Sequence, residues 1–269
     1  MKRKSLFLLA GIAVMSLLAL PSWSAAKPEQ APKEKVIYRT FAVKDFTALN
    51  VSGAVKVIYA QGPLRVTAKG TERDLSFLKI TQSQGKLRVQ TNSKVSVSRH
   101  PKKVTVYVTV PHLTDLSVGG ASKFKAGRLQ AEGFQLLVAG ASDVEIGDLD
   151  CQSLKAEANG ASGLKLKGTA KECILKCTGS SDADLKLQGK RLTVSNSGAS
   201  EVDLEFQGGD VVVDCTGSSE ASLTVSCRQL KVKCTGASEA SVAGTAQQFY
   251  HENRGASSIN HKALIVTGR

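Results

Sequence analysis

The 269-residue sequence is poor in aromatic side chains. Phe, Trp and Tyr make up 5% of the residues, and Trp occurs once. Proteins that hold single-stranded nucleic acid by base stacking need several aromatic platforms. The composition therefore argues against a nucleic-acid partner.

Motifs for catalysis and for cofactors are also lacking. The four histidines do not combine with Ser, Cys or Asp in a triad-like order, and no glycine-rich phosphate loop precedes a convincing helix. No Cys or His pair has zinc-ligand spacing outside one column that is predicted to face inward. We therefore expect no enzyme activity, no cofactor and no metal centre. The histidines are His100, His112, His251 and His261.

Residues 1–26 have the pattern of a secretory signal peptide. Basic residues at 2–4 precede an apolar run over 6–20, and small residues at 24–26 offer a cleavage site. The apolar run is shorter than a membrane-spanning helix, and no Cys lies near the cleavage site to carry a lipid. We expect a cleaved, periplasmic or secreted protein with no integral membrane span.

The charge balance is strongly basic. The chain has 36 Lys and Arg against 23 Asp and Glu, and removal of three basic residues with the signal leaves a net charge of +10. Such an excess favours anionic partners such as acidic polysaccharide, envelope lipid or a surface protein. The alternative is that it only keeps an exported protein soluble.

A Gly-Ala-Ser or Gly-Ser-Ser motif recurs eight times, and its spacing is nearly constant. Successive motifs are 20, 20, 19, 19, 19, 19 and 19 residues apart. A fixed period of this length predicts stacked structural repeats. The glycines are Gly120, Gly140, Gly160, Gly179, Gly198, Gly217, Gly236 and Gly255.

Apolar residues fall at even offsets from each glycine, and polar residues fall at odd offsets. This alternation is typical of strands with one buried side. Two strands that meet at a Gly-Ala-Ser corner form one coil, so the sequence predicts an all-β fold, a parallel β-helix with coils of 19–20 residues. The usual crossover preference favours a right-handed helix. Gly fits the crowded corner, and the Ser hydroxyl is expected to hydrogen-bond a corner amide.

The pattern divides the mature chain into three parts. We interpret residues 27–45 as a polar linker, residues 46–111 as irregular first coils and a cap, and residues 112–269 as the regular repeats. Inward positions become polar at His251, Asn253 and His261. This change predicts a terminal coil that is exposed on one side.

Several segments carry a family resemblance. These are Phe46–Leu49, the Ser52–Ala54 opening, and Pro111–Leu116 ahead of the first corner, followed by the repeats. Over residues 46–263 the chain resembles the head GIN domain family. The resemblance implies an exported bacterial protein of the autotransporter-adhesin kind, with a β-helical fold and no established activity.

Acidic residues occupy one offset on four successive coils. They are Asp182, Glu201, Glu220 and Glu239, flanked by Asp184 and Asp203. Stacked carboxylates are typical of three situations: a solvated face, a weak Ca²⁺ site, or an acid–base pair that acts on polysaccharide. Repulsion between exposed charges at this spacing is only about 1 kcal/mol in water. Nearby Lys165 and Lys186 would offset it, so we favour the solvated face.

Six cysteines in an exported protein suggest disulfides. Cys177, Cys215 and Cys234 share one inward offset, and the last two lie on adjacent coils. A Cα separation of about 5 Å between coils is compatible with a Cys215–Cys234 disulfide. Buried thiols that pack as small apolar groups are the alternative.

A short basic run precedes the repeats. Arg99, His100, Lys102 and Lys103 form either an anion-binding patch or an exposed hairpin tip.

These patterns together favour a non-catalytic, adhesin-like envelope or surface module that binds anionic polysaccharide or lipid headgroups. A polysaccharide lyase or hydrolase that uses the acidic column is one alternative. A periplasmic scaffold for a protein partner is another. Neither the ligand nor the oligomeric state follows from the sequence.

Overall fold

The computed structural model describes residues 35–91 and 104–268. The predicted signal peptide, residues 1–26, and the basic run Arg99, His100, Lys102 and Lys103 lie outside these ranges. Within the described residues, no helix has the length and apolar character needed to cross a membrane.

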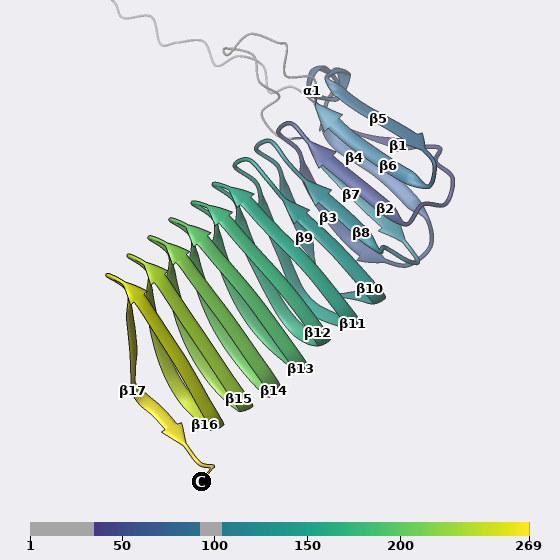
Figure 1. Cartoon of the computed structure of the whole chain (residues 1–269). Coiled ribbons are helices and arrows are strands. Elements are labelled where there is room, and N and C mark those ends of the chain that lie inside the picture. The colour runs from purple at the N-terminus through teal and green to yellow at the C-terminus, as the bar shows by residue number, and fades with distance from the viewer. Residues whose placement is uncertain (1–34, 92–103, 269) are drawn as a thin grey trace, which may run out of the picture. The chain divides into compact units, whose positions relative to one another are not determined.

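The regular repeats form a parallel β-solenoid of about eight turns (Figure 1). The all-β, β-helical fold predicted from the period is therefore confirmed. The strands of this part are β8 (Asp115–Val118), β9 (Lys123–Ala126), β10 (Leu129–Val138), β11 (Asp143–Gly160), β12 (Gly163–Gly179), β13 (Asp182–Gly198), β14 (Glu201–Gly217), β15 (Glu220–Gly236), β16 (Glu239–Gly255) and β17 (Ser258–Val266).

Each coil has two faces that meet at the glycine corner. We call face A the sheet formed by β9 and by the parts of β11–β16 that follow a corner. Face B is formed by β8, β10 and the parts of β11–β16 that lead into the next corner. Figure 1 shows these long strands stacked side by side along the solenoid.

Residues one period apart lie directly above one another. Val194 pairs with Val213, and Val213 pairs with Val232, in parallel register. All three are 0% exposed. The core is therefore a set of vertical columns, and burial of each apolar side chain contributes about 2 kcal/mol to stability.

The corner glycines adopt a left-handed conformation. Gly179 has φ +83° and Gly198 has φ +86°. A Cβ at Gly198 would lie 2.7 Å from the carbonyl oxygen of Gly179. The next amide, that of Ala199, donates to the same carbonyl at 2.8 Å. The coils therefore approach too closely at the corner for any side chain.

The corner serine is buried in most coils, and its partner at most corners differs from the predicted one. The Oγ of Ser200 donates to the carbonyl of Ser197 at 2.8 Å, and Ser142 makes the same bond to Ala139. The amides next to Ser200 already bond to the preceding coil. At these corners the hydroxyl therefore pairs with a carbonyl. At the first and last corners, the hydroxyls of Ser122 and Ser257 also accept from backbone amides, as predicted.

The N-terminal part departs from the regular repeat. It contains β1 (Val36–Phe41), β2 (Ala48–Ser52), β3 (Lys56–Gln61), β4 (Arg65–Thr71), β5 (Leu78–Ser83), β6 (Lys86–Thr91) and β7 (Thr105–Val110). Face A continues through β3, β7, β4 and β1, and face B continues through β2, β6 and β5. Three of these pairings are antiparallel: β1–β4, β4–β7 and β5–β6.

Two expectations for this part were wrong. Residues 36–41, placed in the polar linker, form β1, because Ile37 and Phe41 pack against the core while β1 pairs with β4. A five-residue helix, α1 (Glu72–Ser76), also occurs where none was expected. The side chain of Thr71 caps it by accepting from the amide of Asp74.

The last coil exposes its inward positions, as the polar residues there predict. His251 pairs with Val232 in register, but it is exposed because β17 pairs only with the first half of β16. The rings of Phe249, His251 and His261 gather there, with centroids 5.1–5.3 Å apart.

The corner geometry predicts the effect of a single methyl group. Gly198→Ala should lower the free energy of unfolding by about 2 kcal/mol, because a left-handed backbone and a contact with Gly179 both oppose a Cβ. Urea unfolding followed by circular dichroism measures this change. Gly127→Ala is the matched control, since a Cβ there meets nothing within 4 Å. Equal stability of the two variants would contradict the corner's role.

Candidate functional site

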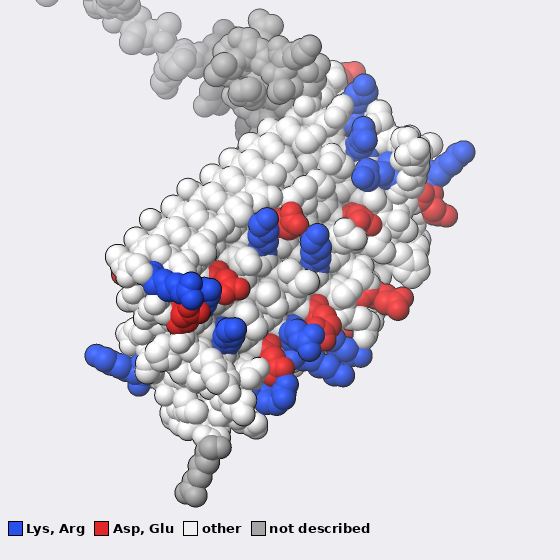
Figure 2. Space-filling view, viewed as in Figure 1, with Lys and Arg blue, Asp and Glu red and all other residues white. Residues whose placement is uncertain are grey.

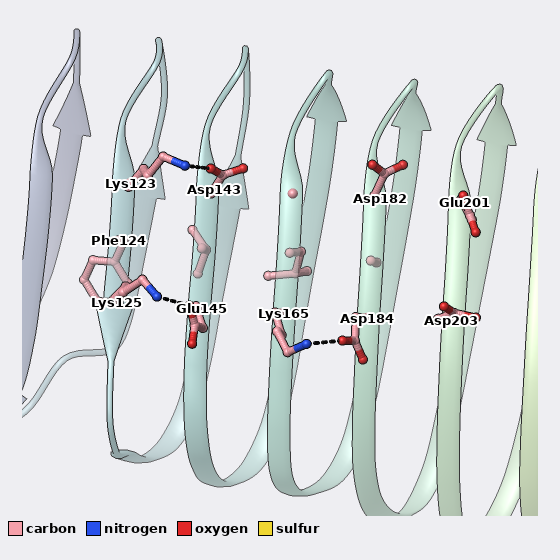
Figure 3. Close-up of a pocket in the computed structure, with 14 residues that line it drawn as sticks. Lys123, Phe124, Lys125, Asp143, Glu145, Lys165, Asp182, Asp184, Glu201 and Asp203 are labelled. Carbon is pink, nitrogen blue, oxygen red and sulfur yellow. Dashed lines mark hydrogen bonds and ion pairs between the residues drawn. The ribbon is translucent and has the colours of Figure 1, made fainter.

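A shallow hollow of about 490 Å³ lies on face A over β9 and β11–β14. Figure 3 shows charged side chains that line it in two columns along successive strands. Gly163 stands between Asp143 and Asp182 in one column and contributes no side chain. The hollow is thus an open trough with charged walls.

Ion pairs between neighbouring coils join the N-terminal part of these columns. The Nζ of Lys123 lies 2.6 Å from Asp143, and that of Lys165 lies 2.5 Å from Asp184 (Figure 3). Lys125 pairs with Glu145 in the same way. This contact with Lys125 holds the pKa of Glu145 below its usual value, and the contact with Asp143 raises the pKa of Lys123.

The predicted acidic column is present. Asp182, Glu201, Glu220 and Glu239 are neighbours in register on β13–β16. None of the four forms an ion pair with another described residue. Lys165 and Lys186 instead neutralise Asp184 and Glu205 in the neighbouring columns.

The column does not form a metal cage. Each strand contributes one carboxylate to it, about 4.8 Å from the next. In residues 35–91 and 104–268, no group of three or more His, Cys, Asp or Glu is placed to hold a metal ion. For Asp182, Glu201, Glu220 and Glu239 the solvated face stays our prediction and the weak metal site stays its alternative.

The excess positive charge lies in the N-terminal part of the described residues. The composition of the whole chain does not reveal this uneven distribution. Residues 35–91 and 104–126 contain 12 Lys and Arg against 4 Asp and Glu, whereas residues 127–268 contain 14 against 17. Face B, which Figure 2 shows, carries scattered charges of both signs. This asymmetry can be found in the sequence by counting charges in each segment rather than over the whole chain.

The inward Cys column is also present. Cys215 pairs with Cys234 in register, and Asn196 fills the position between Cys177 and Cys215. The neighbouring Cys234 thiol and burial both raise the pKa of Cys215. All six cysteines are free thiols in this structure, and all are buried.

Opposed thiols on adjacent coils predict one disulfide. In protein from an oxidising compartment we expect Cys215 and Cys234 to be joined, because in-register strands provide the required Cα separation. Denatured protein should then expose four alkylatable thiols without reductant and six with it, counted by mass spectrometry. Cys234→Ala, the control, should expose five in both conditions. Six thiols in unreduced wild-type protein would rule the bond out.

The unpaired acidic column predicts a salt-dependent gain in stability. Glu220→Gln removes repulsion from Glu201 and Glu239 and should raise the free energy of unfolding by about 1 kcal/mol at low salt. The gain should shrink at 1 M salt, where screening is strong. The control Asp184→Asn breaks the pair with Lys165 and should not stabilise. A gain in wild-type stability with Ca²⁺, but not with equal ionic strength, would instead indicate cation binding.

Similar solved structures share the fold. A putative adhesin from Bacteroides fragilis is 20% identical with a TM-score of 0.67, covering 87% of this chain and 99% of that one. Another from Parabacteroides distasonis is 16% identical with a TM-score of 0.71, covering 82% and 98%. A putative lipid binding protein from the same species is 14% identical with a TM-score of 0.57, covering 86% and 96%. No curated protein is similar to the chain in sequence.

A family model covers nearly all of the part that the structure describes. It matches residues 45–207 and again 188–268, and its description is "putative auto-transporter adhesin, head GIN domain". The two overlapping matches follow the internal repeat, since the same corner motif recurs in both. The chain therefore belongs to the head GIN domain family.

Proposed function

We propose that the protein is an exported, non-catalytic, adhesin-like module that binds anionic polysaccharide or lipid headgroups of the cell envelope. The observation that carries this proposal is the registered array of charged side chains on long, open faces. A strand spacing of about 4.8 Å repeats along each face. Such a face suits an extended or flat partner, which meets the same spacing at every coil.

Three further features support the proposal. The excess of basic residues in 35–91 and 104–126 provides attraction for an anionic surface. The hollow on face A is shallow and lined by charged side chains, unlike the enclosed apolar pockets typical of small-molecule sites. The signal-like residues 1–26 and membership of an adhesin family favour export.

Binding to a ligand panel tests the proposal. The mature protein should bind polygalacturonate, heparin or phosphatidylglycerol vesicles at low salt. Affinity should fall as salt rises, because exposed charges are screened over about 10 Å at 0.1 M. Neutral dextran and phosphatidylcholine vesicles are the controls. Failure to bind any anionic ligand would overturn the proposal, and release of oligosaccharides from a polymer would establish the enzyme alternative.

A further inference from the structure

The N-terminal end of face A carries a row of basic and aromatic side chains. In this sheet β1 lies beside β4, β4 beside β7, and β7 beside β3. The register places Tyr38, Lys69, Thr105 and Lys56 in one line across the four strands. A second line contains Thr40, Thr67, Tyr107 and Ile58. These residues, together with Arg65, are called the basic–aromatic patch.

The cations of the patch have no acidic partner among the residues that the structure describes. Lys56, Arg65 and Lys69 form no ion pair with any other described residue, whereas Lys123 and Lys125 on the next strand are paired. None of the outward positions on β1, β4, β7 and β3 is acidic. Beyond β9, the next strand of the sheet carries the outward carboxylates Asp143 and Glu145, which those two lysines already neutralise. The patch is therefore a site of uncompensated positive charge.

Aromatic rings lie among these cations. Tyr38 is 64% exposed, and the Nζ of Lys69 lies 5.5 Å from the centre of its ring. Tyr107 is half-buried next to Thr67 and Ile58. A tyrosine offers an apolar ring face and a hydroxyl together, which suits the C–H face and the hydroxyl groups of a sugar ring.

We propose that the basic–aromatic patch binds a linear acidic polysaccharide. Lys56, Arg65 and Lys69 hold its anionic groups, and the rings of Tyr38 and Tyr107 contact its sugars. Lys69 and Lys56 lie two strands apart, at about 10 Å, so the polymer runs across the strands, along the solenoid axis. This inference rests on the proposed function and assigns its ligand class and its site.

The charge distribution along face A fixes where the polymer binds. The unpaired carboxylates Asp182, Glu201, Glu220 and Glu239 repel an anionic chain from the other end of the same face. The paired charges over β9–β13 separate the two ends. An acidic polymer therefore has one favourable end on face A, namely the patch.

The composition of the patch favours polysaccharide over a lipid bilayer or a second copy of the chain. Binding to a bilayer buries an apolar surface. Val36 on β1 is 51% exposed, but threonines occupy many of the other outward positions and Ile58 is half-buried. The acidic column would complement the patch of a second copy. However, exposed ion pairs add little to affinity, and the cores of protein interfaces are depleted in charged residues.

Two sets of variants test the site on the mature protein. Lys56→Gln, Arg65→Gln and Lys69→Gln together should weaken binding to polygalacturonate at least about tenfold and reduce its salt dependence. Tyr38→Ala with Tyr107→Ala should weaken binding several-fold while leaving the salt dependence unchanged. The matched control is Lys171→Gln, Lys176→Gln and Lys231→Gln, which removes the same charge from exposed positions elsewhere.

Folding is checked separately. The far-ultraviolet circular dichroism of each variant should equal that of the wild type, and the conservative set Lys56→Arg and Lys69→Arg should retain binding. Weaker polymer binding by the variants that remove charge from the patch, with unchanged binding by the control variant, supports the inference.

Each other outcome has a distinct meaning. If the wild type binds no anionic ligand, the proposed function fails. If it binds polygalacturonate but the patch and control variants are weakened equally, only this site is overturned. Loss of binding to phosphatidylglycerol vesicles alone would overturn the polysaccharide assignment in favour of a membrane surface. If, without polymer, the molecular mass from sedimentation is higher for the wild type than for the patch variant, the patch instead joins copies of the chain.

Discussion

Close contact between coils at the glycine corner is the constraint on which the rest of the structure depends. The left-handed turn at each corner glycine brings one backbone against the carbonyl of the coil before it, with no space for a Cβ. The amide that follows then bonds to that carbonyl and locks the coils in register. Register in turn aligns the apolar columns of the interior, whose burial provides most of the stability. Glycine at the corner of each coil thus determines the spacing of the coils, their register and the alignment of the core.

The same register organises the outer surface. Outward side chains of adjacent coils also lie above one another, so oppositely charged neighbours become ion pairs and like-charged neighbours become columns. Exposed pairs contribute little to stability. Their effect is to cancel charge locally, which leaves net positive charge at the N-terminal end of face A and net negative charge at the other. The distribution of charge on this surface therefore follows from the same register that stacks the interior.

The regular part of the fold and the acidic column were predictable from the sequence, because both follow from a single period. Val194, Val213 and Val232 share an offset, as do Glu201, Glu220 and Glu239, and equal offsets became adjacent positions. The N-terminal end was not predictable in this way. Tyr38 meets Lys69 through an antiparallel pairing, for which no period exists, and β1 lies in a stretch with the composition of a linker. The basic–aromatic patch consequently appears only when strands distant in sequence are placed side by side. The disulfide and the ligand stay predictions, because neither follows from backbone register alone.

Contacts along the solenoid run between neighbouring coils, with few that skip one. Gain or loss of a whole nineteen-residue unit in the regular part would therefore leave the joints on either side intact. Such an event would change the distance between the positive and negative ends of face A by the height of one coil. The charged residues at each end would stay the same. Gene duplication within the repeat is thus a simple evolutionary route to relatives with solenoids of different length and the same irregular N-terminal part.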